Sequence, residues 1–570
     1  MKSRFARTLL AALLTVALAL AGEAATRLGS VYFESLDALQ RQCALGAKLY
    51  EAPALETLPA MLPGKIPGGA GIDKGQPLAL HFVDTGADTP GFVLEVVAAA
   101  TPEAYLQSLV GEGVPLPAPA GGFYKLGDGT TAHISGKRLF LAPGMSAGGE
   151  GLVKSVVDAK TALPALPGAI RVTLVPSALI PKIEELGRSL DNLPATMPGA
   201  DEQRAMMRAM LDFYKRILGQ LDALHLGVAV QEEGLFIRTR IVPRAGTEIA
   251  AMVASMQPAQ DAQLAFLDKS ALLACASGRT VVPDPLKQEF IRIYTEMLAV
   301  SPAAKGMPAS ERATLMTQSL RTLGLPMAFA CGLSPDGRAL RVQSMMQMTN
   351  AAAYLDEHFA MLRKPVIRQL SGMTFSEPVV RTYQGARIFT CRSAMDEKSI
   401  EALMQSAAPG AAPGQLDTSL KQAMAFLRPV MQLFSNDLAY AATSDALVFG
   451  MGSPATVEQA LATLRGKATP EAARIRAVLA ASAAPCSLGR LSLAGVLRGI
   501  LLNLPAGDGG QGDLMAAAAM AAVAATPEGE GIVFAGWRAN QELLSALHVP
   551  PSEVKALKAQ IPALIMRSRR

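Results

Sequence analysis

The stretch that decides the fold is Leu224–Met256, which reads LHLGVAVQEEGLFIRTRIVPRAGTEIAAMVASM. Large side chains, nearly all apolar, occupy every second position of the runs 224–230 and 235–241. A period of two places such side chains on one face of a strand, so each run predicts a strand. The residues Glu232-Glu233-Gly234 separate the runs as a polar break, where glycine can take the positive φ of a hairpin turn.

The residues that follow the hairpin predict a helix. Arg238 and Arg240 alternate with the apolar residues of the second strand and are expected to face water, as in an antiparallel sheet with one wet face. Pro243 lacks the N–H that the ladder needs, and Thr247 can cap a helix whose apolar residues follow at helical spacing. Because that helix must bury its apolar side, we expect it to cover the adjacent hairpin.

The same hairpin-plus-helix unit recurs along the chain in blocks of roughly a hundred residues, judged from pattern and not from identity. We therefore expect an α+β fold, in which antiparallel sheets are covered on one face by amphipathic helices. The expected divisions are a signal peptide (1–21), an N-terminal domain (22–160), a central domain of two related blocks (165–365) and a C-terminal domain of two related blocks (366–570).

Composition is that of a folded protein with several domains. At 570 residues the chain is too long for one ordinary core, and it is 50% hydrophobic and 18% charged. The formal net charge is +5, and removal of the first 21 residues takes away Lys2, Arg4 and Arg7 to leave +2. A nearly neutral mature chain has no bulk electrostatic attraction for nucleic acid, so no nucleic-acid partner is expected.

The N-terminus has the pattern of a cleavable signal peptide. Lys2, Arg4 and Arg7 precede the apolar run 8–20, and Ala19-Leu20-Ala21 offers a cleavage site between small residues. The run is short for a membrane-spanning helix, and Glu23 stands where a lipoprotein needs cysteine. We expect a periplasmic or secreted protein that is not lipidated and has no transmembrane span in its mature chain.

The cysteines do not predict a metal site. The mature chain contains five that lie far apart with no C-x-x-C pair, so zinc binding is unsupported and an exported chain keeps at least one free thiol. Cys275 and Cys331 fall in strand-like contexts and could be neighbours, although small buried side chains are the simpler interpretation. The sequence leaves the pairing open among Cys43, Cys275, Cys331, Cys391 and Cys486.

One motif predicts a catalytic residue. Gly144-Met145-Ser146-Ala147-Gly148 matches G-x-S-x-G, with a strand expected before it (138–142) and a helix after it (150–157), as in the nucleophile elbow of hydrolases. That elbow needs a parallel sheet and a later acid and histidine, whereas this strand belongs to an antiparallel meander. Ser146 is therefore a weak candidate nucleophile, and serine hydrolysis is an alternative function.

No other pattern predicts a cofactor or a metal. The run Gly507–Gly512 fits G-x-G-x-x-G but follows a helix end and loop, whereas dinucleotide binding needs a strand before the motif. The chain has no G-x-x-x-x-G-K-[ST] motif, and its five histidines are dispersed. Methionine stripes such as Met345, Met346 and Met348 suit Cu(I), a flexible apolar groove or, most simply, an adaptable core. We expect no cofactor and no metal.

Strand pairs followed by helices, as in GQPLALHFV and LFIRTRIVPRAGTEIAAMV, resemble in layout large exported bacterial proteins of uncharacterised function. The resemblance carries over no functional residue. Together these observations favour an exported, non-enzymatic binding or structural protein of the cell envelope. The alternatives are a serine hydrolase that uses Ser146 and a carrier of apolar ligands held between helix and sheet. The sequence names no partner beyond an envelope component or an apolar ligand, and no oligomeric state.

Overall fold

A computed structural model describes most of the chain. The described residues are 26–568 apart from 62–65, 67–68, 86–89, 112, 145–147, 159–165, 191–199, 301–303, 305–306, 335–338, 368–371, 397–436, 482, 504–520, 522 and 524. The expected signal peptide (1–21) lies outside them.

The chain forms two compact units that are not continuous in sequence. Unit 1 consists of Met1–Pro194, Met210–Ala250 and Asn540–Ala546, and unit 2 of Ala195–Ala209, Ala251–Ala539 and Leu547–Arg570. The helices α7 (Ala200–Gly219) and α8 (Glu248–Ser255) and the strand β20 (Glu542–Val549) have residues in both units. The three-domain division and the relation between blocks stay predictions.

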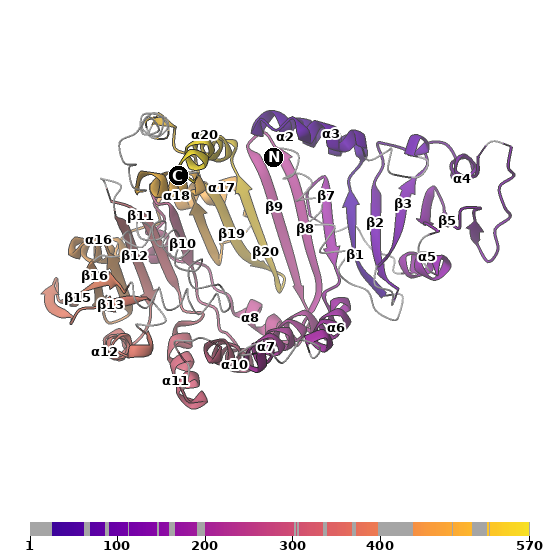
Figure 1. Cartoon of the computed structure of the whole chain (residues 1–570). Coiled ribbons are helices and arrows are strands. Elements are labelled where there is room, and N and C mark those ends of the chain that lie inside the picture. Colours follow the sequence, from indigo (N-terminus) through magenta and orange to yellow (C-terminus); the bar gives the residue numbers. More distant parts are fainter. Residues whose placement is uncertain are drawn as a thin grey trace, which may run out of the picture. The chain divides into compact units, whose positions relative to one another are not determined.

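Unit 1 contains one antiparallel sheet (Figure 1). The pairings give the strand order β4-β5-β6-β3-β2-β1-β7-β8-β9. The strands are β1 (Thr26–Phe33), β2 (Leu78–Asp84), β3 (Gly91–Val97), β4 (Phe123–Lys125), β5 (Thr131–Ser135), β6 (Arg138–Ala142), β7 (Ile170–Leu174), β8 (Leu221–Gln231) and β9 (Gly234–Pro243). Figure 1 shows α2 and α3 at one end of the central strands and α6 at the other.

The helices of unit 1 begin where the sequence offers caps. Ser35 accepts a hydrogen bond from Ala38 N at the start of α2, and Thr101 accepts one from Ala104 N at the start of α4. The helical segments are α2 (Leu36–Tyr50), α3 (Ala54–Met61), η2 (Gly69–Gly71), α4 (Pro102–Val110), α5 (Gly149–Asp158), η3 (Pro176–Leu179) and α6 (Ile180–Leu190).

Around β3 the sheet of unit 1 is covered on both faces. Leu94 and Val96 pack with Leu106 of α4 in one core cluster. Val93 points to the opposite face and packs with Leu152 and Val153 of α5 in another. The α+β class and the antiparallel pairing are therefore confirmed, and at this strand helices extend over the second face as well.

Unit 2 is built on a second set of antiparallel strands, in the order β19-β18-β10-β11-β12-β17-β16-β15-β14, with β13 also paired to β15. The strands are β10 (Leu273–Ser277), β11 (Met327–Leu333), β12 (Leu340–Gln347), β13 (Met373–Phe375), β14 (Val379–Tyr383), β15 (Ala386–Met395), β16 (Asp437–Ala442), β17 (Ala446–Met451), β18 (Ser487–Leu491) and β19 (Ile532–Ala539). The helical segments are α9 (Asp261–Leu264), α10 (Asp284–Ala299), α11 (Ala309–Ser319), η5 (Leu320–Thr322), α12 (Ala351–Leu362), α16 (Pro454–Leu464), α17 (Pro470–Val478), α18 (Leu493–Asn503) and α20 (Pro551–Ser568).

Helices also lie on both faces of β17 in unit 2. Leu355 and Phe359 of α12 pack with Leu447 and other residues of one face. On the opposite face Gly450 lies against α16, where a Cβ would come within 2.5 Å of Val457 N. Glycine at 450 thus allows the helix backbone to approach the strand.

Candidate functional site

The central strands of unit 1 present a continuous face made almost wholly of apolar side chains. The pairings across β2, β1, β7, β8 and β9 align these residues in three rows, which we call the apolar face. The rows are Phe82–Gly29–Leu174–Leu224–Ile241, Leu80–Val31–Val172–Leu226–Thr239 and Leu78–Phe33–Ile170–Val228–Ile237.

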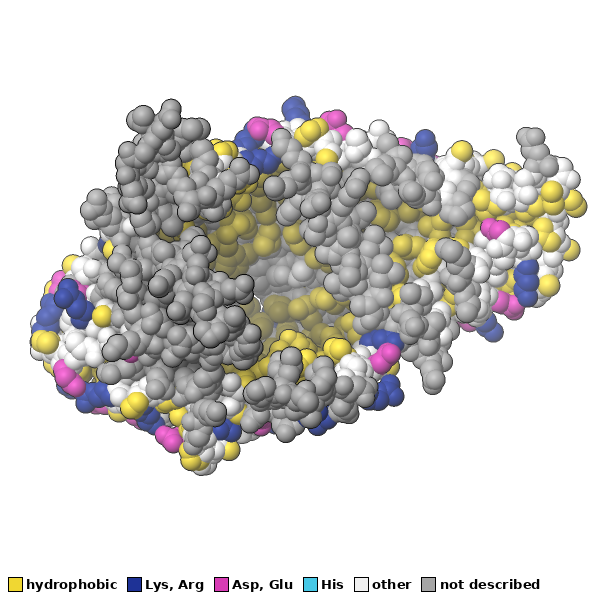
Figure 2. Space-filling model, viewed as in Figure 1, with side chains coloured by type: hydrophobic (Ala, Val, Ile, Leu, Met, Phe, Trp, Pro, Cys, Tyr) yellow, Lys and Arg dark blue, Asp and Glu magenta, His cyan; other side chains and the backbone are white. Residues whose placement is uncertain are grey.

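The apolar face is incompletely covered. Phe82, Gly29 and Leu78 are buried, while the other twelve residues keep part of their surface exposed. Figure 2 shows hydrophobic side chains gathered in a hollow over β8 and β9. A sheet face that forms an ordinary protein core is closed by packed side chains, whereas the described residues close this face only in part.

Helical segments pack at both ends of the apolar face, and at the β1–β2 side the η3 cluster also includes Leu80 and Val31 of the middle row. At one end Gln42 Oε1 accepts a hydrogen bond from Val230 N at 3.0 Å, and the Tyr50 hydroxyl accepts one from Leu235 N at 2.6 Å, so α2 is tied to β8 and β9. At the other end Ala178 of η3 packs with Phe82. The expectation that the helix capped by Thr247 covers the hairpin is wrong: α2 and η3 pack there instead.

One polar pair interrupts the apolar face. The Thr239 hydroxyl of β9 is hydrogen-bonded to the Ser545 hydroxyl of β20, which pairs with β9. Both side chains are partly exposed. Thr239 is the one polar side chain among the fifteen positions of the three rows.

The opposite face of the same sheet contains a directional chain of hydrogen bonds that sequence analysis missed. Arg27 donates to Ser30 Oγ from Nε (3.1 Å) and Nη2 (2.8 Å), so the Ser30 hydroxyl proton is directed to His81 Nδ1 at 2.7 Å. His81 Nε2 therefore carries the ring proton and donates to Glu95 at 3.0 Å. Arg138 donates to the other oxygen of Glu95 at 2.8 Å.

This environment keeps His81 neutral. Burial lowers the pKa of His81, against the hydrogen bond to Glu95, which raises it. For Glu95, burial alone would raise the pKa, but the hydrogen bond and charge of His81, together with Arg138, hold that pKa below its usual value. Ser30, His81 and Glu95 thus each have hydrogen-bond partners, as buried polar groups require.

The Ser30–His81–Glu95 arrangement resembles a catalytic triad in composition but cannot act as one. Ser30 and His81 are 1% and 2% exposed, so no substrate carbonyl reaches the hydroxyl. A triad also places serine on Nε2 and the acid on Nδ1, whereas the order here is reversed. The Ser30 oxygen is in addition engaged by the Arg27 guanidinium, which opposes nucleophilic attack.

The polar face continues across the sheet. Thr173 Oγ1 lies 3.0 Å from His225 Nδ1, and burial lowers the pKa of His225. Arg240 lies on this face opposite the apolar residues, as expected, with 30% of its side chain exposed, and forms a two-pronged ion pair with Glu542 at N–O distances of 2.7 Å. These contacts lock neighbouring strands together and keep the sheet rigid behind the apolar face.

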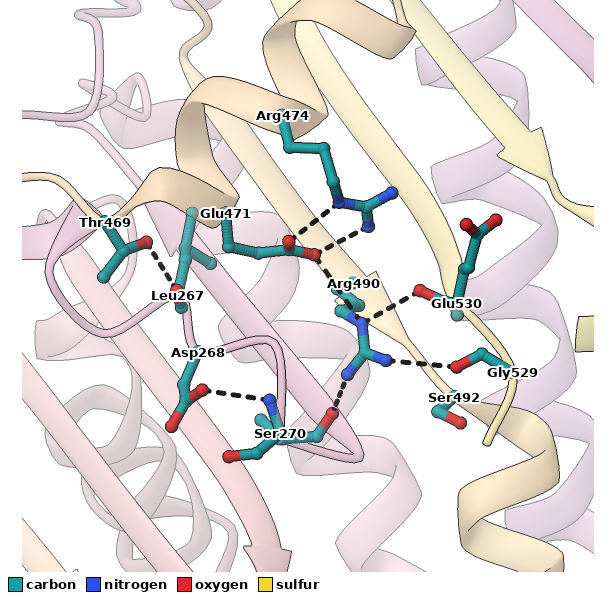
Figure 3. A network of polar contacts seen from close by, with 12 residues as sticks. Leu267, Asp268, Ser270, Thr469, Glu471, Arg474, Arg490, Ser492, Gly529 and Glu530 are labelled. Carbon is teal, nitrogen blue, oxygen red and sulfur yellow. Dashed lines mark hydrogen bonds and ion pairs between the residues drawn. The ribbon is translucent and has the colours of Figure 1, made fainter. Parts of the chain in front are cut away.

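A polar cluster of unit 2 around Arg490 is also structural (Figure 3). The Arg490 side chain is 8% exposed and donates to the carbonyls of Ala271, Gly529 and Glu530. Glu471 lies 3.7 Å from it and forms a two-pronged pair with Arg474. Figure 3 shows the Arg490 and Arg474 side chains pointing toward Glu471, and Arg490 toward the carbonyls of Gly529 and Glu530.

Of the sites suggested by the sequence, the structure describes the methionine stripe but not Ser146 or the run 507–512. Ser146 and the run 507–512 lie outside the described residues, so both stay predictions. The strand before Ser146 is β6, which pairs antiparallel with β3 and β5. Met345 is buried, and Met346 and Met348 pack against a core cluster, as expected of an adaptable core.

The cysteines are free and carry no candidate chemistry. Burial raises the pKa of all five thiols, that of Cys391 to about 11, which keeps them protonated and unreactive. Cys275 and Cys331 lie on adjacent strands, but Cys275 is opposite Phe329 and Cys331 is opposite Leu273. Such diagonal neighbours are about 7–8 Å apart, which is too far for a disulfide.

Within the part of the chain that the structure describes, no group of three or more histidine, cysteine, aspartate or glutamate side chains could hold a metal ion. The described helices also include none with the length and hydropathy needed to cross a bilayer. No protein-family model, no curated protein and no solved structure matches the chain. The resemblance in layout to exported bacterial proteins stays an expectation.

Proposed function

We propose that the protein is an exported, non-enzymatic binding protein that holds an apolar ligand on the apolar face of unit 1. The N-terminal segment with its basic and apolar parts supports export. The observation that carries the proposal is the partial exposure of twelve aligned residues on five adjacent strands.

The size of the face supports ligand binding. Five strands spaced about 4.8 Å apart and three rows of side chains give an area of about 19 Å by 14 Å. Ligand sites are lined mainly by apolar side chains with a few polar groups, and this face has that composition. At about 25 cal/mol per Å², covering even part of this area supplies a binding free energy of several kcal/mol.

The rigidity of the sheet supports the same function. The hydrogen-bond chain from Arg27 to Arg138 and the Arg240–Glu542 pair fix the strands from the opposite face. A face held in place before binding loses less conformational entropy when the ligand arrives.

Binding of N-phenyl-1-naphthylamine, whose fluorescence rises in apolar surroundings, tests the proposal with the chain from residue 22 onward. We expect saturable binding, weakened about tenfold in Leu226→Asn because a central apolar contact worth about 1.5 kcal/mol is lost. Val281→Asn alters a side chain that is 56% exposed in unit 2 and should leave the affinity unchanged. Absence of binding to the wild type, or equal effects of the two substitutions, would overturn the proposal.

A further inference from the structure

We propose that the ligand of the apolar face is an acyl ester, whose alkyl chain lies on the rows of apolar side chains and whose carbonyl oxygen is held by the Thr239–Ser545 hydroxyl pair. This inference rests on the proposed function and adds the chemical class of the ligand.

The hydroxyl pair has hydrogen-bonding capacity to spare. Two hydroxyls share one hydrogen bond, and whichever of them accepts it keeps a proton of its own to donate. Thr239 lies in the middle row beside Leu226, so a ligand that covers these apolar side chains is within reach of the hydroxyl pair. A carbonyl oxygen is the acceptor that matches one available donor.

The charge of the surroundings favours a neutral ligand group. None of the fifteen positions of the apolar face is a lysine, arginine, aspartate or glutamate. Arg240, the cation next to Thr239 in sequence, alternates to the opposite face and is paired with Glu542. An ionised carboxylate held at Thr239 would be desolvated with no cation beside it, which an ester avoids.

A peptide cannot bind the apolar face by adding a further strand to its sheet. Their edges are used in the ladders between β2, β1, β7, β8 and β9, and β9 pairs in turn with β20. Strand addition requires a free sheet edge, so an extended peptide has no backbone groups to pair with at this face.

Competition for bound N-phenyl-1-naphthylamine by methyl laurate and by laurate at pH 8 tests the inference. In Thr239→Val we expect the affinity for methyl laurate to fall about fivefold, because one hydrogen bond is lost, and the affinity for the naphthylamine to stay within about twofold. Ser545→Ala should act in the same direction. Thr382→Val, an exposed strand threonine of unit 2, is the matched control and should change neither affinity.

Each other outcome overturns the inference in a distinct way. If both probes bind but Thr239→Val and Ser545→Ala leave methyl laurate unaffected, or laurate binds more tightly than its ester, the hydroxyl pair does not select an ester and only this inference fails. If the wild type binds neither probe, the proposed function fails with it. If the chain is a dimer that excludes the naphthylamine, a second copy is the occupant.

Discussion

Ser30 Oγ and His81 Nδ1 lie 2.7 Å apart across the β1–β2 pairing, and both side chains are buried within the sheet. Because Arg27 donates to the same oxygen, the Ser30 hydroxyl donates its proton to His81 Nδ1. His81 is therefore the tautomer that carries its proton on Nε2. This contact therefore fixes the protonation state of a buried histidine through a neighbouring hydroxyl.

Removal of the Ser30 hydroxyl is expected to destabilise unit 1. Ser30→Ala leaves His81 Nδ1 without its donor and the Arg27 guanidinium without one acceptor, which should cost about 1–3 kcal/mol of unfolding free energy. Urea unfolding followed by circular dichroism measures the change. Ser135→Ala removes an exposed hydroxyl and should stay within about 0.5 kcal/mol of wild type. Equal effects of the two substitutions would contradict the hydrogen-bond chain.

The stability of the protein is expected to fall as the pH drops below 6.5, and His81 is one cause. Its folded pKa lies below the ordinary value of 6.5, so the unfolded chain binds the proton first. The contribution of His81 is complete above pH 6.5 and is lost as the pH falls toward the lowered folded pKa. Between pH 7.5 and 5.5 this amounts to at most about 1.4 kcal/mol.

Comparison of unfolding midpoints at pH 7.5 and 5.5 isolates this contribution. His81→Gln should lose less stability on acidification than the wild type, because glutamine binds no proton in this range. An unchanged pH dependence in His81→Gln would show that the histidine is not held neutral.

The Arg490 cluster is expected to be the most sensitive polar group of unit 2. Arg490→Met leaves three carbonyls, two of them in buried hydrogen bonds, without their donor and should cost about 3–5 kcal/mol. Arg363→Met removes a guanidinium paired with Glu377 on the surface and should cost no more than about 1 kcal/mol. Thermal unfolding of the two variants gives the comparison, and a cost for Arg490→Met as small as that for Arg363→Met would contradict this role.

The close approach of α16 to β17 makes Gly450 intolerant of a side chain. Gly450→Ala places a Cβ 2.5 Å from Val457 N, and the required shift of the helix should cost about 1–3 kcal/mol. Gly151→Ala places its Cβ in open space on α5 and should stabilise by about 0.5–1 kcal/mol. Denaturant midpoints of the two variants should therefore move in opposite directions, and a stabilised Gly450→Ala would contradict the packing.

Local structure around the opening stretch could be predicted from sequence. The alternation predicted β8 and β9, and the hydroxyl of Thr247 accepts a hydrogen bond from Ala250 N at the start of α8 as expected. These features depend on residues within a few positions of one another, and the preferences of strands, turns and caps act at that range.

The candidate site could not be predicted because it depends on distant segments. The residue that ties α2 to β8 is Gln42, which lies 188 positions before Val230 in the chain, so local periodicity favoured the adjacent helix as the cover. The hydrogen-bond chain likewise joins Ser30 to His81 across 51 positions. The sequence does show His81 as a polar residue between the large apolar residues Leu80 and Phe82 of a strand. This pattern could have marked His81 as a candidate site residue, but it does not identify the residues that bond to it.

The most direct test of the account is photo-cross-linking of the chain from residue 22 onward with a lauroyl ester that carries a diazirine on its alkyl chain, followed by peptide mapping. The account predicts that the label falls on peptides containing β1, β7, β8 and β9 and that an excess of methyl laurate removes it. Label confined to other parts of the chain, or label that methyl laurate does not displace, would contradict the assignment of the apolar face as a ligand site.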